Sequence, residues 1–141
     1  MDKKIVQVKV VAGAVISDNK VLIIQRSSDE SLYPNMWELP SGKREPLEPT
    51  DKALMREIKE ETGLNIEIIK ILSVFDYQIE KEDEIRDATQ INYLMKPAGE
   101  ANVKISSEHQ NYTWISMDEI DNYDIAKETK NVIKEVLSEE I

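Results

Sequence analysis

Three glutamates follow one another at the spacing of a helical turn in the stretch Arg56–Glu61. Residues three and four apart are neighbours on a helix surface, so Glu57, Glu60 and Glu61 share one face. Carboxylates this close repel one another, and partial shelter from water increases the repulsion. Oxygen ligands suit hard cations such as Mg²⁺, Mn²⁺ or Ca²⁺, and Mg²⁺ commonly completes its shell with water and substrate phosphates. The spacing therefore predicts a divalent-cation site, for which a phosphate ester would be the natural second ligand.

An apolar stripe borders these glutamates on the same predicted helix. At about 100° per residue, Leu54, Met55 and Ile58 lie beside the glutamates, whereas Lys59 points away from them. The carboxylates would then stand at the edge of a buried face. A run of acidic residues is also typical of a solvated helix surface, so this spacing alone leaves both interpretations open.

The surrounding 23 residues carry a longer motif, GKREPLEPTDKALMREIKEETGL. Its defined positions are Gly42, Glu48, Arg56-Glu57, Ile58, Glu60-Glu61, Gly63 and Leu64. In residue type and spacing this stretch resembles the complete Nudix box of the Nudix (MutT-like) hydrolases. The resemblance implies a Nudix-type α/β/α sandwich, of the α/β class, with a mixed β-sheet. It also implies a pyrophosphohydrolase that uses water and a divalent metal, Mg²⁺ or alternatively Mn²⁺, to cleave a diphosphate linkage.

The resemblance also assigns roles to residues of the motif. Glu57, Glu60 and Glu61 match the family's metal ligands, together with the backbone carbonyl of Ser41, where the family commonly has a glycine. Arg56 matches the arginine that orients a box glutamate, and the alternative is an exposed ion pair with Glu60.

Three further positions support this box. Glu48 is expected to assist either the metal shell or the start of the helix. Gly42 and Gly63 border the helix, where a close backbone approach or a positive φ can require glycine.

Two glutamates are candidates for the group that removes a proton from the attacking water. Glu57 can act between Arg56 and the metal, whereas Glu108 precedes a predicted strand at a place where family members often carry such an acid. The alternative for Glu108 is a solvated loop residue. The single histidine, His109, is expected to have a surface or hydrogen-bonding role.

Other side chains are candidates for binding the substrate. Arg26, Lys43 and Arg44 could meet phosphates, or they could be surface residues and, for Arg26, a structural ion pair. Tyr33, Trp37 and Tyr77 could stack on a nucleobase, whereas Phe75 is expected in the core.

We expect a nucleoside triphosphate, modified or not, to be the substrate. Dinucleoside polyphosphates, ADP-ribose and nucleotide sugars are alternatives, and so is a non-catalytic module that senses a nucleotide. The start of the last predicted helix reads AKETKN, without an asparagine clearly in register with the one that reads oxidised purines in relatives. The chain has no cysteine, which the family's isomerase branch requires.

Composition limits the class of protein further. A length of 141 residues predicts one domain over 1–141, and no long apolar run indicates a membrane span. A formal charge of −10 disfavours binding to nucleic acid, and the lack of cysteine suits a cytoplasmic protein. A homodimer remains open.

The elements that must position these residues follow from their patterns. Strands are expected at 4–16, 21–24, 74–77, 90–95 and 112–115, with a charged connection at 80–87 and a loop over most of 27–49. Thr50 is expected to cap a helix at about 51–62 that ends at Gly63. Ser116 to Glu119 predict a capping box, and a last helix is expected to bury Ile125, Thr129, Val132, Ile133, Val136 and Leu137.

Overall fold

The computed structural model describes residues 2–139 of the chain. Its strands and helices, in chain order, are β1 (Lys4–Ser17), β2 (Lys20–Arg26), β3 (Trp37–Glu38), β4 (Ser41–Lys43), α1 (Thr50–Thr62), β5 (Ile66–Glu80), β6 (Glu84–Pro97), β7 (His109–Ile115), the 3₁₀ helix η1 (Met117–Asn122) and α2 (Lys127–Ser138).

The long strand β1 organises a mixed sheet with the order β3-β2-β1-β6-β5. It runs parallel to β6 from the pair Lys4 and Glu84 to the pair Val15 and Met95, whereas β2 and β4 pair with it in antiparallel fashion. β7 extends the sheet beside β2. The predicted mixed sheet is therefore present, with the apolar run of β1 at its centre.

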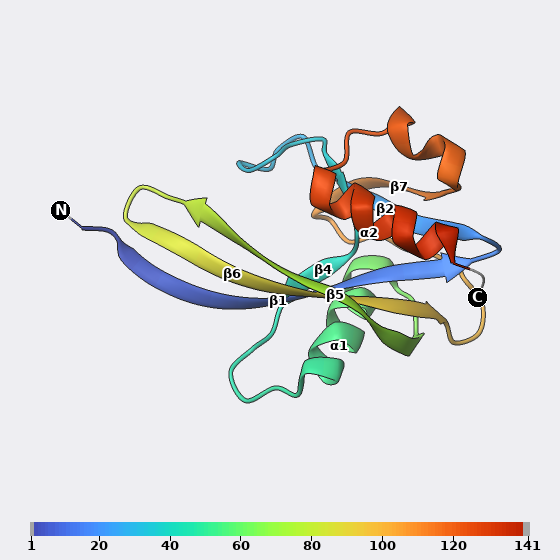
Figure 1. Ribbon diagram of the computed structural model, residues 1–141, viewed down its shortest axis with the longest axis horizontal. Coiled ribbons are helices and arrows are strands. Elements are labelled where there is room, and N and C mark those ends of the chain that lie inside the picture. The colour runs from blue at the N-terminus through green and yellow to red at the C-terminus, as the bar shows by residue number, and fades with distance from the viewer. Residues whose placement is uncertain (1, 140–141) are drawn as a thin grey trace.

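Two apolar clusters cover the two faces of this sheet. Strand residues alternate between the faces, so Ala14 and its neighbour Val15 belong to different clusters. Helix α1 packs on one face through Leu54 and Ile58. Helix α2 packs on the other through Ile133, as Figure 1 shows with α1 below and α2 above the long strands. The layered α/β arrangement follows from this alternation.

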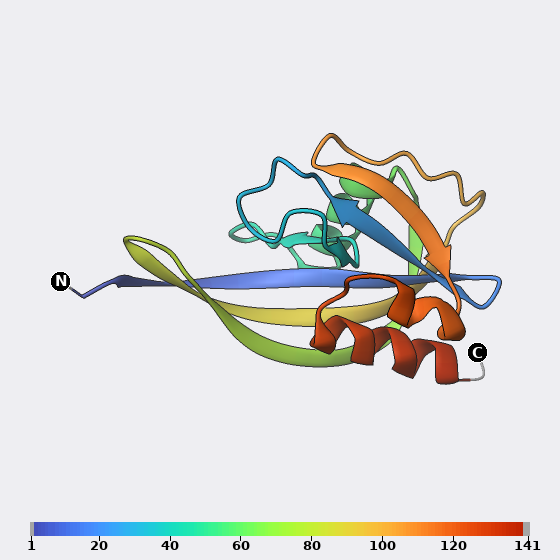
Figure 2. The ribbon, with the colours of Figure 1, turned by 90° about the horizontal axis from the view of Figure 1, so that it is seen from above.

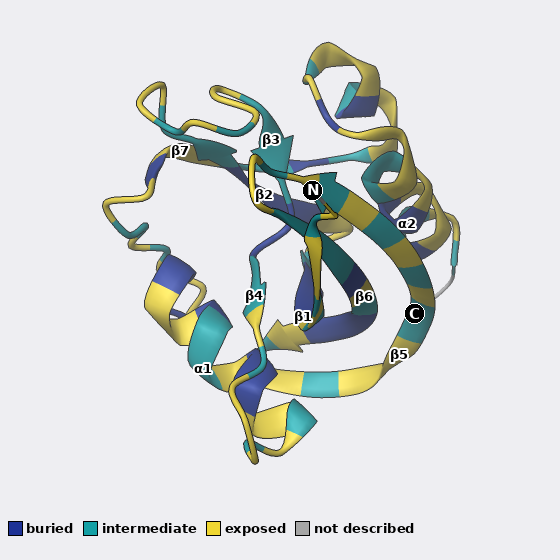
Figure 3. Ribbon diagram, turned by 90° about the vertical axis from the view of Figure 1, so that its left-hand side faces the viewer, coloured by how far each residue is buried: buried dark blue, intermediate teal, exposed yellow. Residues whose placement is uncertain are grey.

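The first half of β1 and the hairpin of β5 and β6 extend away from the helices as an arm (Figures 1 and 2). The predicted boundaries were wrong here, because 80–87 is mostly strand and the connection shrinks to residues 81–83. Pairing along the whole of β1 extends β6 through its charged residues. Figure 3 shows β5 at the outside of the sheet, where exposed and half-buried residues alternate.

The segment 27–49 was predicted as a loop, and it contains the short strands β3 and β4. β3 pairs with β2, and β4 pairs with β1 through Ser41, Gly42 and Lys43. Strands of two and three residues show no alternating pattern of their own, since they form only against a neighbour. β4 fixes the chain directly before the glutamate-rich helix.

Helix α1 ends as predicted and begins differently. Gly63 has a φ of 74° in the left-handed region and closes the helix. Thr50 was predicted as the cap, but Pro49 occupies that position and Thr50 is the first helical residue. A proline can start a helix, since it sets a suitable φ. Glu57, Glu60 and Glu61 lie in the last two turns of the helix.

The C-terminal elements largely follow their predicted patterns. Ser116 caps η1, and its N–H donates to the carboxylate of Glu119 at 3.0 Å, as expected of a capping box. Helix α2 buries Val132, Ile133 and Val136. Within residues 2–139, no helix has the length and apolar content needed to span a bilayer.

Candidate active site

The short strand β4 brings its backbone against the side of α1 that carries Glu57. A Cβ atom added to Gly42 would collide with the carboxylate of Glu57, so this position has no room for a side chain. Glycine is therefore required for close approach, as the motif predicted. The contact fixes the position of Glu57 relative to the sheet.

Arg56 holds three carboxylates of the motif in place. Its Nε donates to Glu48 Oε2 at 2.8 Å and its Nη1 to Glu57 Oε1 at 2.7 Å, with Glu60 more distant at 3.4 Å. Arg56 therefore orients Glu57, and the ion pair with Glu60 alone does not describe its role. The hydrogen bond from Arg56 lowers the pKa of Glu48 to about 2, and Glu48 in turn raises the pKa of Arg56.

Glu61 is the buried carboxylate of the group, with 8% of the residue exposed. Its Oε1 accepts a hydrogen bond of 2.7 Å from the backbone N–H of Ser41, so Ser41 lies beside the glutamates. Burial raises the pKa of Glu61 to about 8, and the nearby charges of Glu38, Glu57 and Glu108 add to this effect. Burial also raises the pKa of Glu57, against the influence of Arg56. Both shifts arise mainly from burial, and neighbouring carboxylates add to each of them.

A cavity of about 260 Å³ gathers the acidic side chains. It is lined by Glu57, Glu60, Glu61, Ser106, Ser107 and Glu108. The structure thus brings Glu108, from the connection before β7, to the glutamates of α1. The four carboxylates and their repulsion fit a divalent cation. Among residues 2–139 they do not form a preformed metal site, and Arg56 bonds Glu57 and Glu60 while the N–H of Ser41 bonds Glu61.

His109 connects this cavity to the neighbouring strand β3. Its side chain is 2% exposed, its Nε2 lies 2.9 Å from Glu38 Oε2, and its Nδ1 lies 4.0 Å from Glu61 Oε2. The expected hydrogen-bonding role is confirmed, and a surface position is wrong. Glu38 was not predicted, because nothing in the sequence links it to His109. The only signal was its place directly before the motif in Trp37-Glu38-Leu39-Pro40.

A second cavity of about 460 Å³ adjoins the carboxylates at Glu38 and Ser41. Arg26 lines it and forms ion pairs of 3.4 Å with Glu30 and Glu38, so the predicted structural ion pair is present, whereas contact with phosphates stays a prediction. Lys43 and Arg44 line neither cavity. Arg44 instead donates from Nε to the backbone oxygen of Glu48.

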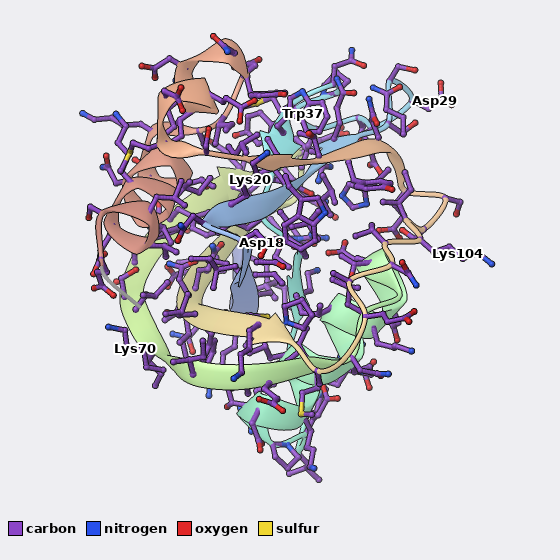
Figure 4. The ribbon with its side chains drawn as sticks, turned by 90° about the vertical axis from the view of Figure 1, so that its right-hand side faces the viewer. Asp18, Lys20, Asp29, Trp37, Lys70 and Lys104 are labelled. Carbon is purple, nitrogen blue, oxygen red and sulfur yellow. The ribbon has the colours of Figure 1, made fainter. Side chains whose placement is uncertain are left out.

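The predicted aromatic residues all line the larger cavity. Trp37 meets Tyr123 edge to face with ring centres 5.1 Å apart, and Figure 4 shows it in the upper layer of the molecule. Tyr77 lies beside Phe75 with ring centres 6.0 Å apart. Tyr33 is 60% exposed at the mouth. Phe75 packs on the core, as expected, and also reaches the cavity.

Comparison with known proteins agrees with this arrangement. The sequence model of the NUDIX domain family matches residues 8–136. The chain is 28% identical over 131 residues to the nucleoside triphosphatase NudI of Escherichia coli O1:K1, covering 89% of this chain and 93% of that protein.

Solved structures share the fold. The MutT NUDIX hydrolase from Burkholderia pseudomallei matches with a TM-score of 0.75 at 25% identity, over 93% of this chain and 98% of that one. An Ap4A hydrolase from C. elegans matches in fold with a TM-score of 0.71 at 22% identity, over 92% and 94% of the two chains. With the family's model spanning nearly the whole chain, the protein belongs to the Nudix hydrolases, enzymes that act on diphosphate bonds and generally use divalent metal ions.

Proposed function

We propose that this chain is a Mg²⁺-dependent pyrophosphohydrolase that cleaves a diphosphate linkage of a nucleoside triphosphate by attack of water. The observation that carries this proposal is the adjacency of two cavities. One is lined by Glu57, Glu60, Glu61 and Glu108, and the other, next to it at Ser41, is lined by aromatic side chains. The first suits a metal and phosphates, and the second suits a base.

The metal ligands in this proposal are the carboxylates of Glu57, Glu60 and Glu61 and the backbone carbonyl of Ser41. When bound, Mg²⁺ supplies positive charge that binds the diphosphate and favours ionisation of water, and Mn²⁺ is the natural substitute. Arg56 orients Glu57 through its bond of 2.7 Å and opposes the rise in the pKa of Glu57 that burial causes. Gly42 leaves room for that carboxylate, and Glu48 fixes Arg56 from the other side.

Glu108 is the general base in this proposal. It is exposed and shares the acidic cavity, so it can reach a water in that space. Glu57 is the competing candidate, but one of its oxygens is occupied by Arg56. Replacement of a general base costs about 10²–10⁴-fold in rate. Glu108→Gln should therefore lower kcat by that factor, and an unchanged kcat would assign the role to Glu57.

The nucleoside would occupy the larger cavity, with its base stacked on aromatic side chains such as Trp37 and Tyr77 and with Arg26 near its phosphates. Similarity to a nucleoside triphosphatase supports triphosphates over dinucleoside polyphosphates or ADP-ribose. The formal charge of −10 argues against nucleic acid as a partner. A cytoplasmic location, a single domain over 1–141 and either a monomer or a homodimer belong to the same proposal.

The test is a substrate panel with Mg²⁺, containing canonical and oxidised nucleoside triphosphates, dinucleoside polyphosphates and nucleotide sugars. Chromatography of the products identifies the bond that breaks. Turnover of triphosphates that collapses in Glu60→Gln supports the proposal. Turnover confined to another class would replace the substrate, and nucleotide binding without turnover of any compound would overturn the enzymatic proposal.

A further inference from the structure

A hydrogen-bonded network of three polar side chains connects β5 and β6 beside the larger cavity. Asn92, in the middle of β6, has no exposed surface. Its Nδ2 donates to Ser73 Oγ on β5 at 3.2 Å, and its Oδ1 accepts from Gln90 Nε2 at 2.8 Å. An amide buried among apolar side chains is costly unless its hydrogen bonds are made. This network provides the hydrogen bonds that the buried Asn92 side chain needs, and it also fixes the amide of Gln90.

Gln90 is the outer member of this hydrogen-bonded network and lines the cavity. It pairs across the sheet with Phe75, so the two side chains share a face, and both line the cavity. Because Nε2 is engaged by Asn92, the amide is oriented rather than free to rotate. Its Oε1 accepts no hydrogen bond from residues 2–139 and is not buried. The oriented group therefore offers an acceptor to a ligand.

The charges around the cavity favour the same kind of ligand. Its lining includes the acidic residues Glu38 and Glu128. Arg26 is the only basic side chain in the lining, and Glu30 and Glu38 already pair with it. Glu128 and Oε1 of Gln90 thus offer acceptors in this lining, which suit N–H donors on a ring held against Phe75 and Tyr77.

We propose that Gln90 determines base specificity, with its Oε1 accepting a hydrogen bond from the exocyclic amino group of adenine or cytosine, and that Asn92 and Ser73 are its positioning residues. This inference rests on the proposed function for the site. The keto counterparts hypoxanthine and uracil place an oxygen where the amino group stands. An oxygen facing Oε1 leaves two acceptors without a proton between them, which disfavours binding.

The test compares matched pairs of nucleotides, ATP with ITP and CTP with UTP, for kcat/KM. The wild type should favour the amino member of each pair by about tenfold, roughly the value of one neutral hydrogen bond and the avoided repulsion. Gln90→Met keeps the length of the side chain and should bring both ratios near one through KM, with little change in kcat.

Asn92→Leu tests the positioning role, because it leaves Gln90 in place and removes the group that orients it. It should also lower the ratios. The control is Gln7→Met, the same chemical change at an exposed position of β1. It should leave both ratios at the wild-type value.

Calorimetric binding of AMP, IMP, CMP and UMP separates this inference from the proposed function, since it requires no hydrolysis. Preferential binding of AMP and CMP that Gln90→Met abolishes supports the role of Gln90 even if no triphosphate turns over. Equal binding within each pair, or a preference that survives in Gln90→Met, overturns it even if the enzyme hydrolyses triphosphates.

Discussion

The absence of a side chain at Gly42 lets the carboxylate of Glu57 lie against β4. In Gly42→Ala the new methyl group would occupy the place of that carboxylate, so Glu57 must move. Displacing a ligand-orienting contact costs about 10–100-fold in metal affinity or activity. We expect kcat/KM at limiting Mg²⁺ to fall by that factor.

Gly99→Ala is the matched control for this change. Gly99 has a φ of 113°, and no atom lies within 4 Å of an added Cβ. Alanine there strains the backbone without reaching the site. Its activity should equal that of the wild type, even if its free energy of unfolding falls. A Gly42→Ala enzyme with normal Mg²⁺ dependence would contradict the packing argument.

Glu48 gives the protein a pH-dependent contribution to stability. Arg56 lowers the pKa of Glu48 to about 2 from its ordinary value of 4.5, so the folded state binds fewer protons than the unfolded state between these values. The contribution is complete above about pH 4.5 and disappears as the pH falls towards 2. The free energy that Glu48→Gln removes, measured by urea unfolding, should therefore be larger at pH 6 than at pH 2.5. Glu45→Gln, also exposed and nearby, is the control and should show no such trend.

The end of helix α1 depends on a backbone conformation that glycine adopts easily. Gly63 has a φ of 74°, and an added Cβ would lie 3.3 Å from the Cβ of Lys104. Gly63→Ala should lower the free energy of unfolding by about 1 kcal/mol. Gly63→Asn should lose less, because asparagine tolerates this region. Equal urea midpoints for Gly63→Ala and the wild type would show that the cap contributes nothing.

At the scale of helices and strands, sequence patterns predicted the elements that have a periodic pattern or a motif of their own. Such patterns predicted the buried half of β1, the helix that ends at Gly63 and the apolar stripe of α2. β3 and β4 were not, since strands this short depend on partners far along the chain. The pair of Glu38 and His109 was missed for the same reason. The two residues are 71 positions apart in the sequence, and they meet because β2 pairs with both β3 and β7.

At the scale of the whole molecule, the acidic site lowers the stability of the folded state at neutral pH, because folding raises the pKa of a carboxyl group there. Glu61 is buried near Glu38, Glu57 and Glu108, and burial has raised its pKa to about 8. A ligand that binds only the folded state adds RT ln(1 + [L]/Kd), about 2.7 kcal/mol at a concentration of 100 times Kd. We therefore expect Mg²⁺ to raise Tm by several degrees at pH 7.5 in differential scanning calorimetry.

The same experiment must separate a specific site from general screening of a chain with a net charge of −10. Glu61→Gln and Glu82→Gln each remove one negative charge, but Glu82 lies in the exposed turn between β5 and β6, at the end of the arm. Screening would stabilise both variants alike. A site built on α1 predicts that Glu82→Gln keeps the full Mg²⁺ shift in Tm. Glu61→Gln should lose most of that shift and, without metal at pH 7.5, should be more stable than the wild type, because folding then requires neither a proton nor a buried charge at this position.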